Sequence, residues 1–201
     1  MAIHPPILYA GYIGLVMPFV ISTSHLIMKK NNNEWVEMAE KATFFPWLFL
    51  TAGISLGAAW SYEVLGWGGY WAWDPVENAS LFPWLTGTAY MHSVLIQEKK
   101  NMLKGWNVIL IMMTFTLTIF GTYLTRSGII SSIHAFAATD LGIWFLGFIV
   151  IIVLFNIIIL YYSNNVLQSQ TKLASVISRE SGFLFNQMLF VAICIAVFWG
   201  T

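Results

Sequence analysis

Charged residues are scarce in this chain. Only 9% of its 201 residues are Asp, Glu, Lys or Arg, whereas 58% are hydrophobic, and the mean hydropathy is +0.73. Soluble domains carry about 25% charged residues. A water-soluble core cannot hold this much apolar surface, so the composition predicts that a lipid bilayer surrounds most of the chain. The formal net charge is zero, which gives no indication of a nucleic-acid partner.

Cysteine is almost absent. Cys194 is the only one, so the chain has no internal disulfide, and it lacks the CxxC motif of a thiol oxidoreductase. Cys194 lies in an apolar run, where we expect it to pack as a small hydrophobic side chain. The N-terminus has no basic region of the kind that opens a secretory signal. Because an apolar run reaches almost to the last residue, we expect the chain to be part of a larger protein.

Six apolar segments predict an all-α membrane protein, a polytopic bundle of about six transmembrane helices without a soluble domain. Each segment is long enough, or nearly so, to cross about 30 Å of hydrocarbon at roughly 1.5 Å per helical residue. We therefore interpret residues 1–201 as a single transmembrane domain. The predicted spans are 7–28, 44–62, 76–97, 106–124, 141–162 and 183–198.

The loops between these spans differ in charge. One side of the membrane would carry the N-terminus and loops 66–74 and 125–140, with Arg126 as its only Lys or Arg residue. Short loops rich in Lys and Arg stay on the cytoplasmic or matrix side, so the Arg126 side is predicted to face outward. The opposite side would carry the remaining cations: Lys29, Lys30, Lys41, Lys99, Lys100, Lys104, Lys172 and Arg179.

An aromatic segment precedes the third predicted span. Residues 67–73 read WGGYWAW, with three tryptophans and one tyrosine beside glycines. They form either an interfacial aromatic belt or a flat surface for a planar apolar ligand. The glycines would let the backbone come close to such a ligand. The following DPVE, residues 74–77, predicts a helix start with Asp74 as N-cap. The alternative to ligand binding by Asp74 and Glu77 is therefore that they serve only to cap this helix.

The chain has only four histidines, and their positions are informative. His92 lies inside a predicted span, where an ionisable residue is costly and usually functional; a neutral histidine bonded to a neighbouring helix is the alternative. His4 and His134 lie on the predicted outer side, on either side of the aromatic segment. Each alone would be an ordinary loop histidine, but together the three suit one haem on the outer face and a second within the membrane. His25 is interpreted as an interfacial residue.

Arg126 is the only cation predicted on the outer side. It could neutralise haem propionates as a bidentate donor. The alternative is an interfacial ion pair with Asp140, Asp74 or Glu77. The sequence leaves both open.

Several stretches resemble one family. Residues 67–85, WGGYWAWDPVENASLFPWL, resemble the WWD signature of haem-handling membrane proteins, which we assign to 66–85. The continuation DPVENAS is more similar to the cytochrome c maturation haem lyases of the CcmF type than to CcmC delivery proteins or CcsA-type synthetases. Residues 121–128 (GTYLTRSG), 132–136 (SIHAF) and 4–12 (HPPILYAGY) are also similar to CcmF. The similarity predicts a middle portion of such a protein, either a fragment or one product of a split gene.

The resemblance implies a role in cytochrome c biogenesis, as a haem lyase subunit that is not active alone. Such an enzyme joins haem through thioether bonds to the CxxCH motif of apocytochrome c. It would work in a bacterial inner membrane, or alternatively a mitochondrial one, with the N-terminus and WWD segment on the periplasmic or intermembrane side. The implied partners are a haem chaperone, apocytochrome c, and other maturation subunits, including the rest of the lyase. A CcmC-type haem conduit or a structural membrane subunit are the alternatives.

The resemblance also implies roles for particular residues. His4 and His134 would bind the iron of the incoming haem, and His92 would be one axial ligand of a permanent haem b in the membrane. The remaining candidates for contact with the incoming haem are Trp67, Trp71, Trp73, Asp74 and Arg126. No side chain is assigned as a catalytic base.

Overall fold

The computed structural model describes residues 3–29, 33–64, 69–130, 132, 141–168 and 178–201. Within these ranges the regular structure is entirely helical, which confirms the predicted all-α class. The helices are α1 (His4–Gly14), α2 (Val16–Ile27), α3 (Glu34–Val64), α4 (Pro75–Lys100), α5 (Lys104–Ser127), α6 (Leu141–Tyr162), α7 (Asn164–Leu167) and α8 (Arg179–Gly200).

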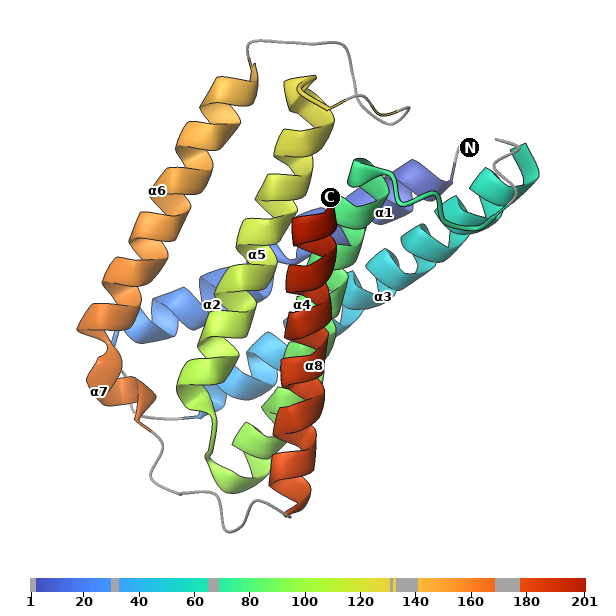
Figure 1. Cartoon of the computed structure of the whole chain (residues 1–201). Coiled ribbons are helices and arrows are strands. Elements are labelled where there is room, and N and C mark those ends of the chain that lie inside the picture. Colours follow the sequence, from blue (N-terminus) through green and yellow to red (C-terminus); the bar gives the residue numbers. More distant parts are fainter. Residues whose placement is uncertain (1–2, 30–32, 65–68, 131, 133–140, 169–177) are drawn as a thin grey trace.

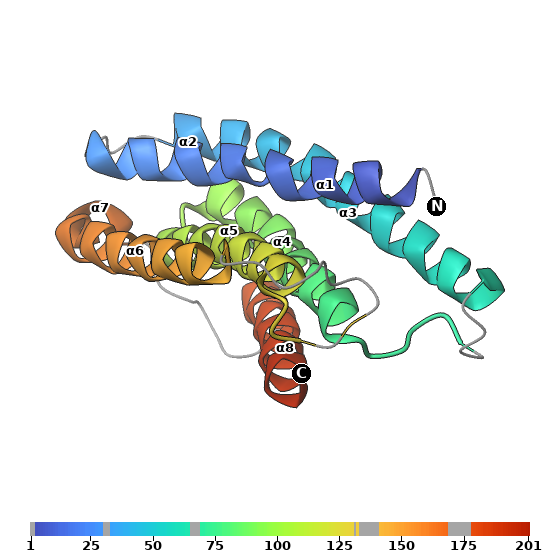
Figure 2. The ribbon, with the colours of Figure 1, turned by 90° about the horizontal axis from the view of Figure 1, so that it is seen from above.

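Helix α4 occupies the centre of the bundle. It packs against α3, α5 and α8, while α1 and α2 lie along α3, and α6 packs on α5 (Figure 1). Seen from above, α1, α2 and α3 form a layer on one side of α4 and α5, and α8 lies on the other side (Figure 2).

All six predicted spans are helical, and of the described helices five are long and apolar enough to cross a membrane. α1 and α2 together, from His4 to Ile27, count as one of these, and the others are α3, α5, α6 and α8. The 26 residues of α4 are also long enough to cross, but its sequence is more polar and it is not among the five. Its polar side chains, such as Thr86 and Gln97, are buried among the neighbouring helices.

Two helix boundaries differ from the predicted spans. α3 begins at Glu34, ten residues before the predicted span 44–62, because its first turns bury one face that includes Trp35, Val36 and Ala39. A search for continuous apolar runs does not detect such an amphipathic start. The first span is divided at Leu15 into α1 and α2, close to Pro18, which has no N–H to donate to the carbonyl of Gly14.

Hydrogen bonds between side chains join the central helices. Thr114 on α5 donates to the Thr86 hydroxyl at 2.8 Å, and Asn107 on α5 donates to the Gln97 carbonyl oxygen at 2.7 Å. Trp106 on α5 likewise donates to Gln187 on α8 at 2.9 Å. In an apolar environment such bonds satisfy polar groups that lipid cannot, so they fix α5 against α4 and α8.

The predictions for His25 and Cys194 compare differently with the structure. His25 lies in the last turn of α2, where an interfacial residue was expected, but it does not extend to the surface: it is only 5% exposed and its ring stacks on Trp35 with ring centroids 5.2 Å apart. The early start of α3 supplies this covering ring. Cys194 is buried in a hydrophobic cluster with Phe82, as predicted.

All the described Lys and Arg residues except Arg126 lie at one end of the bundle, which we call the lysine-rich end. α2 and α4 finish there and α3, α5 and α8 begin there, whereas Arg126 lies at the opposite end, near the last turn of α5 (Figure 1). Lys30 and Lys172 lie outside the described residues. The cations at this end are Lys29, Lys41, Lys99, Lys100, Lys104 and Arg179.

Glycines allow α1 to approach α3 closely, and this contact can be tested. A Cβ added at Gly53 would lie 2.9 Å from the Cα of Leu8, so Gly53→Ala must push the two helices apart. We expect it to lower the free energy of unfolding by about 1–3 kcal/mol, measured by thermal unfolding of the purified protein. Gly147→Ala on α6 is the matched control, since nothing lies within 4 Å of its added Cβ. Equal unfolding temperatures for the two variants would contradict this account of the contact.

Candidate functional site

A cavity opens between α1, α3, α4 and α5 at the end opposite the lysine-rich end. It has a volume of about 200 Å³ and continues into a smaller pocket of about 50 Å³ that shares His4, Leu8 and Val76. We call the two together the His4 cavity. Its lining also includes Tyr9, Tyr12, Trp60, Trp71, Glu77, Ser80, Gly121, Thr122, Thr125 and Arg126. Three predicted site residues from separate stretches, His4, Trp71 and Arg126, therefore meet around one cavity.

The imidazole of His4 is held in a defined orientation by α3. Its Nδ1 lies 2.7 Å from the carbonyl oxygen of Gly53. Because a carbonyl can only accept, Nδ1 carries the hydrogen, and in the neutral ring Nε2 carries the lone pair. Gly57 leaves room for the ring, since a Cβ there would lie 2.5 Å from the His4 Cε1. A backbone bond to one ring nitrogen is the usual way in which proteins orient a metal-binding histidine.

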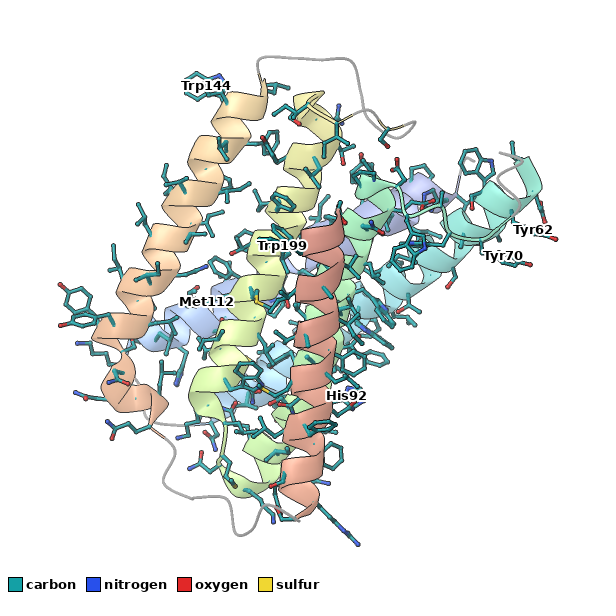
Figure 3. All side chains as sticks on the ribbon, in the orientation of Figure 1. Tyr62, Tyr70, His92, Met112, Trp144 and Trp199 are labelled. Carbon is teal, nitrogen blue, oxygen red and sulfur yellow. The ribbon has the colours of Figure 1, made fainter. Side chains whose placement is uncertain are left out.

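The described part of the aromatic segment, residues 69–74, is irregular and leads into α4, as predicted. Trp71 is half-buried and lines the cavity, whereas Trp73 is 65% exposed and has a positive φ of 60°. Tyr70 stacks on Tyr62 of α3 with centroids 4.5 Å apart, as Figure 3 illustrates. Trp67 lies outside the described residues. The segment thus exposes the rings of Tyr70 and Trp73 and directs that of Trp71 into the cavity wall.

Asp74 and Glu77 form the predicted capping box. Asp74 accepts a hydrogen bond from the Val76 amide at 3.1 Å, and Glu77 accepts from the amides of Ala72 and Asp74 at 3.0 and 3.3 Å. Asp74 also accepts from the hydroxyl of Ser132 at 2.7 Å. These two carboxylates therefore fix the backbone of the aromatic segment at the start of α4.

Asn78 connects the aromatic segment to two helices, and sequence reasoning missed it. The Trp71 indole donates to its side-chain oxygen at 3.2 Å, and its Nδ2 donates to the Trp73 carbonyl at 3.2 Å and to Thr201 at 2.9 Å. Asn78 is only 3% exposed. Its sequence position, just after a capping box, does not by itself reveal these contacts.

Sequence reasoning also missed Tyr12 and Trp60 as cavity residues. The hydroxyl of Tyr12 donates to the Ala79 carbonyl at 3.1 Å, and a Cβ added at Gly121 would lie 2.8 Å from that hydroxyl. Trp60 comes from α3 and faces the same cavity. An aromatic residue within an apolar span gives no sequence signal that separates a cavity wall from lipid contact.

His92 belongs to a different place in the bundle. It follows Pro75 by 17 residues (92 − 75), so it lies about 26 Å from that end of α4 at roughly 1.5 Å per residue. Its Nδ1 lies 2.7 Å from the Thr88 carbonyl, which leaves the lone pair on Nε2 of the neutral ring. The ring is half-buried and stacks near Phe190 of α8, with centroids 5.9 Å apart (Figure 3).

His134, the predicted partner of His4, lies outside the described residues, so their pairing stays a prediction. Among the residues that the structure describes, no three His, Cys, Asp or Glu side chains cluster as a metal site. Haem iron needs only one or two axial side chains, because the porphyrin supplies the other ligands.

Comparison with known proteins places this chain in a family. The model of the family described as "Cytochrome C assembly protein" matches residues 1–131. The cytochrome c-type biogenesis protein CycK of Bradyrhizobium diazoefficiens is 41% identical over the whole chain, and CcmF of Haemophilus influenzae is 41% identical over 98% of it. A solved structure, "Cytochrome c Heme Lyase CcmF", superimposes with a TM-score of 0.82 at 36% identity over the whole chain.

The chain therefore belongs to the cytochrome c assembly protein family, a class of helical membrane proteins. Within that family, it corresponds in sequence and fold to part of a CcmF-type protein, which confirms the resemblance expected from the sequence. It spans about 30% of the length of CycK, 31% of H. influenzae CcmF and 30% of the solved chain. Its assignment to the middle portion stays a prediction.

The contacts of Asn78 lead to a test of the aromatic segment. Asn78→Ala leaves the Trp71 indole and Trp73 carbonyl without these partners, which costs about 1–3 kcal/mol for a buried group. We expect chymotryptic cleavage within residues 70–73 to accelerate at least about fivefold, with a smaller effect for Asn78→Asp, which keeps an acceptor for Trp71. Asn164→Ala, at an exposed position in α7, is the control. Unchanged cleavage in Asn78→Ala would show that this residue does not hold the segment.

Proposed function

We propose that this chain forms part of a membrane haem lyase and binds incoming haem at the His4 cavity for attachment to apocytochrome c. The observation that carries the proposal is the geometry of His4, whose Nδ1 donates to Gly53 and so presents Nε2 as the nitrogen with the lone pair. The names of the relatives, which include a haem lyase, support it.

The lining of the cavity fits haem, the substrate of this reaction. Leu8, Val76 and the aromatic side chains supply apolar, partly flat walls for a porphyrin, and Trp73 offers an exposed ring in the adjoining aromatic segment. Arg126 lies in the same wall and suits the propionates as a bidentate donor. In this proposal Trp67 and Trp71 complete the aromatic surface on which the porphyrin packs, and Asp74 fixes the backbone of that surface through the capping box.

The two axial positions of the incoming iron would be taken by His4 and His134. In the reaction, each of two cysteine thiols of the CxxCH motif adds to a vinyl group of haem: a C–S bond forms, and the thiol hydrogen ends on the other vinyl carbon. Residues of this chain hold the porphyrin while the peptide approaches, so the catalysis is by positioning. The histidine of the CxxCH motif would then replace one axial ligand and permit release.

His92 would hold a second, resident haem b. Its half-buried imidazole, with the lone pair on Nε2, would bind the haem iron, and a second iron ligand would come from another part of the larger protein. When bound there, such a haem would supply one-electron transfer, passing electrons from an external reductant to the incoming iron. The separation of His92 from the start of α4 makes it a site distinct from the His4 cavity.

The proposed setting is a bacterial inner membrane, with a mitochondrial inner membrane as the alternative. The cations at the lysine-rich end favour the cytoplasmic or matrix side for that end and the outer side for the His4 cavity. Haem chaperone, apocytochrome c and the other maturation subunits would then reach the cavity from outside.

Absorption spectroscopy and haem titration of the purified protein, with the rest of the lyase, test these roles. We expect His4→Ala and His134→Ala to weaken capture of added haem at least tenfold, since losing merely an outer-shell partner costs about 10–100-fold. His92→Ala should instead remove the bis-histidine spectrum of the resident haem. His25→Phe is the control, because it keeps the ring stacked on Trp35 away from both sites.

Two outcomes would overturn the proposal. A colourless preparation that also fails to capture haem would favour a structural subunit. Wild-type haem capture in both His4→Ala and His134→Ala would remove these residues from the site.

A further inference from the structure

A separate cavity of about 320 Å³ lies at the lysine-rich end, between the last turns of α4 and the first turns of α8. We call it the Lys99 cavity. It is lined from α4 by Leu95, Ile96, Lys99 and Lys100, and from α8 by Arg179, Glu180 and Phe183. None of these residues takes part in the His4 cavity or contacts His92 in the hydrogen bonds and ring contacts described above.

The charges around the Lys99 cavity favour an anion. Three cations meet one carboxylate there, and Glu180 is engaged with Lys100 in an ion pair. Lys99 and Arg179 are exposed and, within the described part of the chain, neither forms an ion pair with an acidic side chain. Two cations from two different helices are thus available on opposite walls of one cavity. Phosphate groups are anions that Lys and Arg bind well.

Both walls of the cavity place an apolar side chain one turn deeper than a cation. Leu95 precedes Lys99 by four residues on α4, and Phe183 follows Arg179 by four residues on α8, which runs the opposite way; each is therefore about 6 Å deeper at roughly 1.5 Å per residue. Leu95 is 40% exposed and Phe183 is 43% exposed, so both present apolar surface. This order, cation at the end and hydrocarbon beneath, matches a phospholipid, whose phosphate is followed by acyl chains.

We propose that the Lys99 cavity binds an acidic phospholipid, with Lys99 and Arg179 on the headgroup phosphate and Leu95 and Phe183 against the upper acyl chains. Basic pockets between helices on the lysine-rich side of membrane proteins suit such headgroups. A free phosphate would use the cations but leave the apolar walls without a function. The bound lipid would contact the ends of α4 and α8 beside the ion pair of Lys100 and Glu180, which already joins them.

Native mass spectrometry of the purified protein with the rest of the lyase can test this site. Phosphatidylglycerol should bind more tightly than phosphatidylcholine with the same acyl chains. The double variant Lys99→Gln/Arg179→Gln should weaken phosphatidylglycerol binding about thirty-fold, since each cation near an anionic headgroup contributes a factor of roughly five. Lys99→Arg/Arg179→Lys, which keeps both charges, should retain it. Lys29→Gln/Lys41→Gln removes two charges from the same end but not from this cavity, and should bind as the wild type does.

Two further measurements separate a lipid from a free anion. Phe183→Ala should weaken binding of phosphatidylglycerol but leave the weak binding of glycerol phosphate unchanged. Inorganic phosphate at millimolar concentration should not displace the lipid. The proposal is overturned if phosphate displaces it, if phosphatidylcholine binds equally well, or if the Lys29/Lys41 control loses as much binding as the Lys99/Arg179 variant.

Discussion

The structure depends on one constraint, which is that a polar helix can lie among transmembrane helices only where other helices cover it. α4 is long enough to cross a membrane, yet it carries Asn78, Thr86 and Gln97, whose side chains are buried. α3, α5 and α8 surround it and supply hydrogen-bond partners, so few of its polar groups meet lipid. Because α4 is held in this way, the aromatic segment at its start, His92 within it and the cations at its end have fixed positions.

A second constraint is the close contact between α1 and α3. Gly53 lets the backbone of α1 approach, and its carbonyl receives the hydrogen from His4, while Gly57 leaves space for the imidazole ring. The same pair of glycines therefore allows the close packing of α1 on α3 and the orientation of the His4 ring. A residue with a Cβ at either position would change both the contact between the helices and the direction of the His4 ring.

The sequence predicted those features that arise from local chemistry or from composition. Five of the six helical segments follow from apolar length, and the capping box of Asp74 and Glu77, which follows from residue types at fixed spacing, marks the start of the sixth, α4. The gathering of His4, Trp71 and Arg126 was expected from topology and resemblance. The early start of α3, the burial of His25 and the contacts of Asn78 were not predictable, because each depends on which helix packs beside it. A periodic pattern reports that a face is buried but does not identify its partner.

The two histidines are oriented by different parts of the molecule, and this bears on their proposed roles. The Nδ1 of His92 donates to the Thr88 carbonyl of its own helix, so this hydrogen bond does not depend on how neighbouring helices move. The Nδ1 of His4 donates instead to a carbonyl on another helix, α3, so its orientation is lost if α1 shifts. A permanent ligand suits the first arrangement. A ligand that must be bound and then released suits the second, because a displacement of α1 changes the direction in which the His4 ring points. The difference supports a resident haem at His92 and a passing one at His4.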